Sequence, residues 1–206
     1  MMEVVQGEGG VLALDEQFVK DVCALAEREN ILVIFDEVQT GNGRTGTLFA
    51  YMQYGLTPDV VSTAKGIGGG LPLGATLLGE KAENLFTPGL NGSTFGGNPV
   101  AAAGALSILS RIDEELLAQV REKSEFIVNE LHHTKGVKSV SGMGLMLGIE
   151  TEKDAGEVIA RCMQRGVLVI KAKHKVRLLP ALNIPMEQLK TAIKTLKEVI
   201  EARNIC

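Results

Sequence analysis

Two residues that could do chemistry stand at the ends of short candidate strands. Asp36 directly follows the apolar run 31–35, and Lys65 comes three residues after a second candidate strand, 60–62. An unbroken apolar run that ends in a carboxylate is typical of a strand buried on both faces. Ligands of open α/β sheets lie beyond the carboxyl ends of the strands. We therefore expect an acid and an amine at such an edge, beside the glycine-rich residues 66–70.

This pair of side chains suits pyridoxal phosphate. The cofactor needs a lysine that forms a Schiff base and a carboxylate that keeps the ring nitrogen protonated, so that the ring can take up electrons. Taken alone, Lys65 could also be a surface lysine in a flexible loop, and Asp36 a turn aspartate at the end of a strand. The motifs around both residues favour the chemical interpretation.

Five short motifs resemble those of the class III (subgroup II) aminotransferases, and those of the acetylornithine aminotransferase family most closely. They are VQGEGG at 5–10, FDEVQTG at 35–41, GRTG at 43–46, AKGIGGG at 64–70 and GSTFGGNP at 92–99. Each motif alone is weak evidence, whereas five in the family's order are strong evidence. The resemblance covers essentially the whole chain and implies a pyridoxal-phosphate-dependent enzyme of fold type I.

The resemblance implies roles for the residues around Asp36 and Lys65. Lys65 would carry the cofactor as a Schiff base and, once freed, would move a proton between substrate and cofactor. Asp36 would be the partner of the ring nitrogen, through a charge-assisted hydrogen bond. Gln39 would contact the ring hydroxyl, with a polar loop glutamine as the alternative. Glu37 and Val38 would contact the cofactor mainly through their backbone.

The small-residue loop 91–98 offers two hydroxyl groups among glycines. Such a loop suits a phosphate, because hydroxyls and backbone N–H groups can converge there without crowding. In the family that this chain resembles, the threonine, here Thr94, binds the cofactor phosphate of the neighbouring subunit, and the serine, here Ser93, lies near the substrate. The resemblance therefore implies a homodimer with shared active sites. Asn91 stands where the family often has histidine.

Arg177 is a charge within the apolar segment 175–180. Burying a guanidinium is costly unless it is paired, and arginine matches a carboxylate with two parallel hydrogen bonds. The resemblance implies that Arg177 holds the α-carboxylate of glutamate or of the amino-acid substrate. It also implies that Glu8, in the turn 6–10, is a gate that pairs with this arginine. The alternatives are an edge-strand arginine in solvent and a solvated loop carboxylate.

The reaction that the resemblance implies is transamination. N-acetylornithine would give its terminal amino group to the cofactor, and 2-oxoglutarate would take it up as glutamate, in arginine biosynthesis. Ornithine aminotransferase and 4-aminobutyrate aminotransferase are the alternatives within this class, and related aminomutases share the lysine and aspartate motifs. A different alternative is a catalytically silent chain: a folding fragment, a non-catalytic subunit or one partner of a split enzyme.

The length of the chain bears on that last alternative. The chain has 206 residues, and proteins of the family it resembles are roughly twice as long. In that family the N-terminal half supplies the first strands of the large domain, a small-residue turn for the cofactor phosphate and an aromatic that stacks on the ring. We therefore expect a C-terminal fragment, a truncated gene product or one half of a split protein.

Composition and charge argue against several other classes. The chain is 45% hydrophobic and 22% charged, with a formal net charge of −4 and no strongly basic stretch, so nucleic acid is not an expected partner. No apolar run approaches ~18 residues and no signal peptide is visible, so no membrane association is expected. Cys23, Cys162 and Cys206 lack CxxC spacing, which predicts free thiols in a reducing cytoplasm. The loop 41–47 lacks the lysine of a P-loop, and the three histidines show no metal-ligand spacing.

Helix and strand patterns place these residues in an α/β chain with two domains. We expect part of the large cofactor-binding domain, with a mostly parallel sheet, over residues 1–112, and a small α/β domain over residues 113–206. Strands are expected at 1–5, 31–35, 60–62, 75–79, 145–149, 167–171 and 176–179. Helices are expected from the cap Asp15 to Asn30, at 81–86, from the cap Asn98 to about Arg111, and at 116–132, 155–165 and 186–203.

Overall fold

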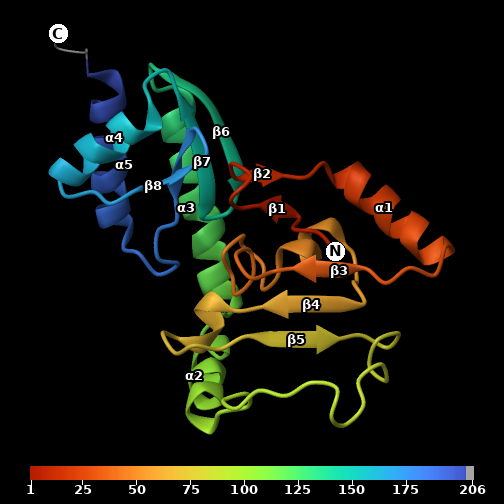
Figure 1. Ribbon diagram of the computed structural model, residues 1–206. Coiled ribbons are helices and arrows are strands. Elements are labelled where there is room, and N and C mark those ends of the chain that lie inside the picture. Colours follow the sequence, from red (N-terminus) through yellow and green to blue (C-terminus); the bar gives the residue numbers. More distant parts are fainter. Residues whose placement is uncertain (203–206) are drawn as a thin grey trace. The chain divides into compact units, whose positions relative to one another are not determined.

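The computed structural model describes residues 1–202, which form two compact units (Figure 1). Met1–Val4 and Leu14–Glu114 make up the first unit, and Val5–Ala13 and the chain from Glu115 onward make up the second. The short segment Val5–Ala13 thus groups with the second unit, whereas the sequence prediction kept residues 1–112 together. Among residues 1–202, no helix is long and apolar enough to cross a membrane.

The first unit contains a three-stranded sheet in the order β3 (Ile34–Asp36), β4 (Val60–Thr63), β5 (Ala75–Leu78). β3 and β4 are parallel, as the sequence predicts, but β5 is antiparallel to β4. The chain returns to β5 through the 3-10 helix η2 (Lys65–Gly68) and the short turn 69–74. A parallel neighbour would need a long crossover connection, so this short return makes β5 antiparallel.

The apolar run before β3 is only partly buried. Ile31 and Leu32 are 56% and 37% exposed, so the predicted burial on both faces is wrong for the first half of the run. Asn30 turns the chain after the preceding helix with a φ of 52°. The amide of Val33 then donates to Asp59 Oδ2 at 2.7 Å instead of to a strand. Regular pairing therefore begins only at Ile34.

The N-terminal strand predicted at 1–5 is split between two partners. Met2 alone pairs with β3, as a parallel bridge to Phe35. β1 (Val5–Gln6) pairs instead with β2 (Leu12–Ala13) in an antiparallel hairpin. The glycine-rich turn that the sequence predicts connects β1 to β2.

Side-chain caps start two helices of the first unit where the sequence predicts them. Asp15 Oδ1 accepts a hydrogen bond from the amide of Phe18 at 2.9 Å, at the start of α1 (Glu16–Arg28). Asn98 Oδ1 accepts two backbone amides at the start of α2 (Pro99–Leu109). Each cap satisfies backbone donors that the first turn of a helix leaves unpaired.

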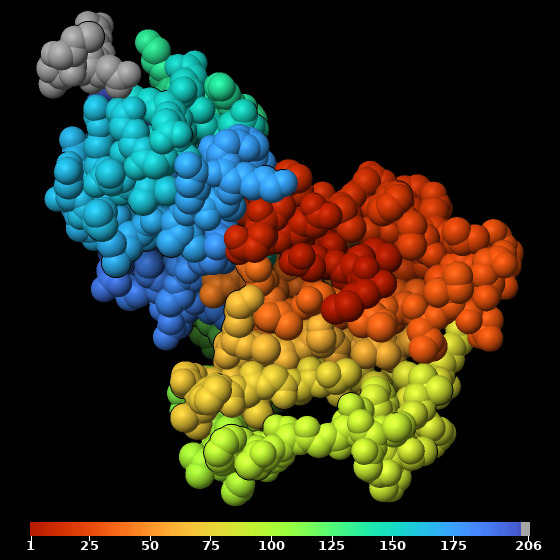
Figure 2. Space-filling view, viewed as in Figure 1, coloured from red at the N-terminus to blue at the C-terminus, as the bar shows by residue number. Residues whose placement is uncertain are grey.

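The segment 79–98, between β5 and α2, lies open on the surface, and we call it the exposed strip. Figure 2 shows it in yellow-green along the edge of the first unit. The helix predicted at 81–86 is wrong, because these residues form turns and irregular backbone. Four large apolar side chains of the exposed strip are exposed: Leu85, Phe86, Leu90 and Phe95. An exposed apolar surface of this kind is typical of a region that contacts another polypeptide.

The second unit is built on a four-stranded antiparallel sheet in the order β6-β7-β9-β8. The strands are β6 (Val137–Met143), β7 (Met146–Thr151), β8 (Ile170–Ala172) and β9 (Lys175–Leu178). The helices α3 (Glu114–His132), α4 (Ala155–Gln164) and α5 (Met186–Glu201) form a common apolar core with one face of this sheet.

The sequence predicts these elements except β6. Two serines, a lysine and a glycine interrupt the apolar pattern of β6, which conceals the strand. The predicted end of the last helix at residue 203 lies outside the described residues, as does Cys206. Cys23 and Cys162 are free thiols.

The other face of this sheet carries the β1–β2 hairpin. Val11, which is fully buried, lies over two glycines of the sheet, Gly142 and Gly148. A Cβ on Gly148 would lie 2.9 Å from Val11 Cβ and 3.2 Å from Gly10 O. Glycine at these positions therefore permits the close approach of the hairpin, and with it of the turn that holds Glu8.

The loop after β3 is held by one buried carboxylate. Glu37 is fully buried, and its two oxygens accept hydrogen bonds from the backbone amides of Ala50 (3.0 Å) and Tyr51 (2.9 Å) and from the hydroxyl of Thr40. These bonds tie the start and the end of the loop 37–51 to a single side chain.

Burial raises the pKa of the Glu37 carboxyl, and the charge of Asp36 adds to this effect. The hydrogen bonds from Thr40, Ala50 and Tyr51 lower the pKa but do not offset the burial. The folded chain therefore holds this proton more tightly than the unfolded chain does. The resulting stability is fully present below the unfolded pKa and is lost as the pH rises through the folded pKa.

We expect Glu37→Gln to lower the free energy of unfolding by about 1–3 kcal/mol, because the NH2 group of glutamine cannot accept a hydrogen bond and would leave the amide of Ala50 or of Tyr51 without its acceptor. The difference from wild type should be largest at about pH 4 and should shrink toward about pH 7, because only the wild-type carboxyl loses stability over that range. Urea unfolding followed by circular dichroism measures both effects. Glu80→Gln, at an exposed glutamate, is the control; a difference that widens with pH would contradict the assignment.

Candidate functional site

Asp36 and Lys65 lie at the carboxyl ends of two adjacent parallel strands. Asp36 is the last residue of β3, and Lys65 comes two residues after the end of β4. In the register of β3 and β4, Asp36 is the partner of Ser62, and Lys65 follows Ser62 by three residues. The amide of Glu37 donates to Ser62 O at 2.8 Å and carries the pairing one residue beyond the strand. The register therefore fixes the backbone of the acid beside the strand from which the amine emerges.

The carboxylate of Asp36 is half-buried and presents one oxygen to a ligand. Oδ1 accepts a hydrogen bond from the amide of Val38 at 2.9 Å, whereas Oδ2 has no hydrogen-bond partner within residues 1–202. Paired residues of neighbouring strands project from the same face of a sheet, so the hydroxyl of Ser62 lies on the face of Asp36. Ser62 Oγ is buried and has no partner in the same described part of the chain. A buried hydroxyl without a partner, beside a carboxylate, suits a polar ligand.

Lys65 opens η2 in a strained backbone conformation. Its φ is 52°, in the left-handed region, which costs a residue with a Cβ on the order of 1–3 kcal/mol. The side chain is exposed, and its amine has no hydrogen-bond or ion-pair partner among residues 1–202. η2 packs closely on α2, since a Cβ on Gly104 would lie 3.2 Å from Gly68 O. A packed turn thus presents an amine that is available for covalent chemistry.

Asn42, which sequence reasoning missed, bridges the loop after β3 and the turn after β4. Its Nδ2 donates to Thr63 Oγ1 and to Ala64 O, both at 3.2 Å. Asn42 is 7% exposed, has a φ of 57°, and keeps Oδ1 buried without a partner among the described residues. An asparagine between Gly41 and Gly43 signals only a turn, so its contact with a segment 21 residues away was not visible in the sequence.

The other predicted residues of the first unit have fewer contacts. Val38 and Gln39 are half-buried after Asp36, and Gln39 makes no side-chain hydrogen bond within residues 1–202. Ser93 and Thr94 lie in the exposed strip, where neither hydroxyl makes a hydrogen bond to a described residue. No three His, Cys, Asp or Glu side chains within that range are arranged to hold a metal ion.

Arg177 and Glu8 form an ion pair within the second unit. Arg177 Nη1 lies 2.8 Å from Glu8 Oε1; the arginine side chain is 10% exposed and the glutamate side chain is 75% exposed. β9 places Val176 and Leu178 in the core and turns Arg177 to the opposite face. Arg177 Nε is buried without a partner among the described residues. A fixed arginine with an exposed glutamate against it can exchange that glutamate for another carboxylate.

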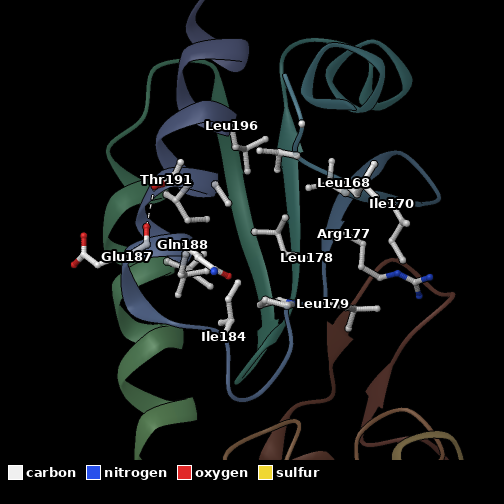
Figure 3. Close-up of a pocket in the computed structure, with 18 residues that line it drawn as sticks. Leu168, Ile170, Arg177, Leu178, Leu179, Ile184, Glu187, Gln188, Thr191 and Leu196 are labelled. Atoms are coloured by element: carbon white, nitrogen blue, oxygen red, sulfur yellow. Dashed lines mark hydrogen bonds between the residues drawn. The ribbon is translucent and has the colours of Figure 1, made fainter. Parts of the chain in front are cut away.

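A groove of about 610 Å³ lies in the second unit, between α5 and the strands β8 and β9 (Figure 3). Its lining is mostly apolar and includes Leu168, Ile170, Leu178, Ile184 and Leu196. Thr191 Oγ1 donates to Glu187 O of the same helix at 2.9 Å, as a helix-surface threonine does. Figure 3 shows the guanidinium of Arg177 directed away from α5. Arg177 is among the residues that line the groove, but its charged end does not point toward the helix side of it.

Comparisons with known proteins give the chain a family. The sequence model described as aminotransferase class-III matches residues 1–200. The acetylornithine aminotransferase of Haemophilus ducreyi is 45% identical over 202 residues, which cover 97% of this chain and 51% of that protein. The chain spans about half the length of the curated relatives it matches.

Solved structures with the same fold are also aminotransferases. The N-acetylornithine aminotransferase of Stenotrophomonas maltophilia is 36% identical with a TM-score of 0.87, and the match covers 96% of this chain and 54% of that one. The ornithine δ-aminotransferase of Plasmodium falciparum is 32% identical with a TM-score of 0.88, over 97% and 54% of the two chains. Class-III aminotransferases use pyridoxal phosphate. With a family match over nearly its whole length, this chain belongs to the class-III aminotransferases.

Proposed function

We propose that this chain is the part of a pyridoxal-phosphate-dependent aminotransferase that carries the reactive lysine and the acid for the ring nitrogen. The register of β3 and β4 carries the proposal, because it brings Asp36 to Ser62 and Lys65 just beyond Ser62. Asp36 Oδ2 and Ser62 Oγ lack partners among residues 1–202, which leaves two polar atoms unpaired on this face. A carboxylate and a lysine are the two groups that this cofactor requires.

Each residue would have one task in the reaction. When bound, the cofactor supplies an electron sink for the substrate carbon that carries the amino group. Asp36 would hold the ring nitrogen protonated through a charge-assisted hydrogen bond. Lys65 Nζ would attach the cofactor and, once displaced by the substrate amine, would move a proton to and from the substrate carbon. Gln39 would contact the ring hydroxyl, and Glu37 and Val38 would contribute their backbone.

We further propose a homodimer with shared active sites. Thr94 would bind the cofactor phosphate in the neighbouring subunit, and Ser93 would lie near the substrate there. The exposure of both hydroxyls, and of apolar side chains such as Phe95 at 80%, supports an exposed strip that meets a second chain.

Arg177 would hold a substrate carboxylate, and Glu8 would occupy the same guanidinium when no carboxylate is bound. The 2.8 Å ion pair supports this role, because the site already binds a carboxylate. The greater exposure of Glu8 supports its exchange for a substrate, since its carboxylate can return to water at little cost.

The amino donor that we propose is N-acetylornithine, with 2-oxoglutarate as acceptor, in arginine biosynthesis. The name of the relative at 45% identity supports this choice. Ornithine is the second candidate, because the Plasmodium falciparum ornithine δ-aminotransferase has a TM-score of 0.88 to this chain.

The proposal is tested with the 206-residue chain alone and co-expressed with the N-terminal half of the Haemophilus ducreyi relative. Titration with pyridoxal phosphate, followed by visible absorbance and by transamination rates, should show binding and turnover in the co-expressed pair. Rates with N-acetylornithine, ornithine and 4-aminobutyrate then rank the donors, and N-acetylornithine should have the highest kcat/KM. Absence of both binding and turnover in the pair would favour a catalytically silent chain.

We expect borohydride reduction of the cofactor-loaded pair to place a covalent label on Lys65, as peptide mapping would show. Lys65→Ala should remove the label and lower kcat by about 100- to 10,000-fold, because it removes the attachment point and the proton carrier. Asp36→Asn should weaken cofactor binding about 10- to 100-fold, because the hydrogen bond loses its charge. Lys81→Ala, at a lysine paired with Glu27 on the surface, is the control and should change neither. A label on any other lysine would refute the assignment.

We expect Arg177→Lys to raise the KM for 2-oxoglutarate about 10- to 100-fold with a smaller change in kcat, because an ammonium cannot form two parallel hydrogen bonds with a carboxylate. Glu8→Ala should lower the same KM, because it removes the competing carboxylate. Steady-state kinetics on the co-expressed pair measure both effects. Arg161→Lys, in a surface pair with Glu157, should leave KM unchanged. Equal effects at positions 161 and 177 would exclude a substrate contact for Arg177.

A further inference from the structure

We propose that Asn42 is a positioning residue that holds the turn of Lys65 against the loop that follows Asp36. The proposal rests on the function proposed above, because that function gives Lys65 its chemical role. In this proposal, the side-chain amide of Asn42 attaches the turn of Lys65 to the loop that follows Asp36.

The hydrogen bonds of Asn42 reach the two residues that directly precede Lys65. Nδ2 donates to Thr63 Oγ1 and to Ala64 O, both at 3.2 Å. Ala64 O also accepts from the amide of Ile67 at 3.3 Å, which is the first hydrogen bond inside η2. Asn42 therefore shares an acceptor with the turn itself and fixes the carbonyl from which the turn starts.

The backbone around Lys65 needs such support. A lysine with a φ of 52° does not hold this conformation by itself, so surrounding contacts must balance the strain. Asparagine tolerates the left-handed region better than most residues, and Asn42, with a φ of 57°, adopts it at lower cost than lysine does. Because Asn42 is 7% exposed, little water competes for its hydrogen bonds.

Asn42 also lies near the residue that follows the lysine. The open side of Gly66 faces Asn42, because a Cβ added to this glycine would lie 3.8 Å from Asn42 Cβ. Asn42 is therefore bonded to the residue before Lys65 and is faced by the residue after it.

The test replaces the amide without changing the backbone. Asn42→Gly keeps the left-handed conformation at no steric cost and removes both hydrogen bonds. Thr63→Val removes one acceptor and keeps the shape of the strand residue. Asn30→Gly is the matched control, because Asn30 has a φ of 52° at the end of α1 and makes no side-chain hydrogen bond within residues 1–202.

Amide hydrogen exchange of the 206-residue chain gives the first measurement. Protection of the Ile67 amide should fall about tenfold in Asn42→Gly and less in Thr63→Val, while Asn30→Gly leaves it unchanged. The double variant N42G/T63V should show the same protection of the Ile67 amide as N42G alone, because N42G already removes the hydrogen bond that T63V removes. Unchanged protection in N42G overturns the proposal; if N42G does not fold by circular dichroism, unchanged protection in T63V overturns it.

Covalent labelling gives the second measurement and separates this proposal from the proposed function. In the co-expressed pair, trapping of pyridoxal phosphate on Lys65 by borohydride should be slower in N42G than in wild type and in N30G, with the same yield at long times. Failure of the wild-type pair to label Lys65 would refute the proposed function and leave the exchange result to decide the role of Asn42. Normal labelling in N42G together with reduced Ile67 protection would show that the hydrogen bonds of Asn42 stabilise the turn but do not position the lysine. This result would also overturn the proposal.

Discussion

The parallel pairing of β3 with β4 is the constraint on which the candidate site depends. One register, Ile34 with Val60 through Asp36 with Ser62, sets the acid beside the strand that leads to the lysine. The two strands have only three and four residues, so their ladder alone cannot fix the loops that leave them. Two buried side chains fix these loops. Glu37 closes the loop that follows Asp36, and Asn42 joins that loop to the turn of Lys65.

The sequence predicts well those features that depend on neighbouring residues. Asp15 and Asn98 cap helices where their side chains meet the next amides, and the buried strand patterns near 34 and 60 are found as strands. Features that depend on distant partners were not visible. Exposure of Ile31 follows from the turn at Asn30, and β6 is a strand through its pairing with β7 although polar residues interrupt its apolar pattern.

The same distinction holds for the site residues. The motifs predict Asp36 and Lys65 as candidate site residues because their neighbours in the chain are distinctive, and the apolar strand around Arg177 makes its charge conspicuous. Asn42 has no such signal, because its partners Thr63 and Ala64 are remote in sequence. The grouping of Val5–Ala13 with the second unit was also unpredictable, because it depends on the approach of Val11 to Gly142 and Gly148.

The central place of β4 in its sheet has a consequence for how the protein would fail on heating. β4 pairs with β3 along one edge and with β5 along the other, and no other strand of that sheet joins them. Fraying of β4 would free the segment before the lysine and the neighbour of the acid in one event. The acid would keep one backbone contact, since the amide of Asp36 donates to Met2 O at 2.9 Å, whereas the lysine turn would lose the strand from which it starts.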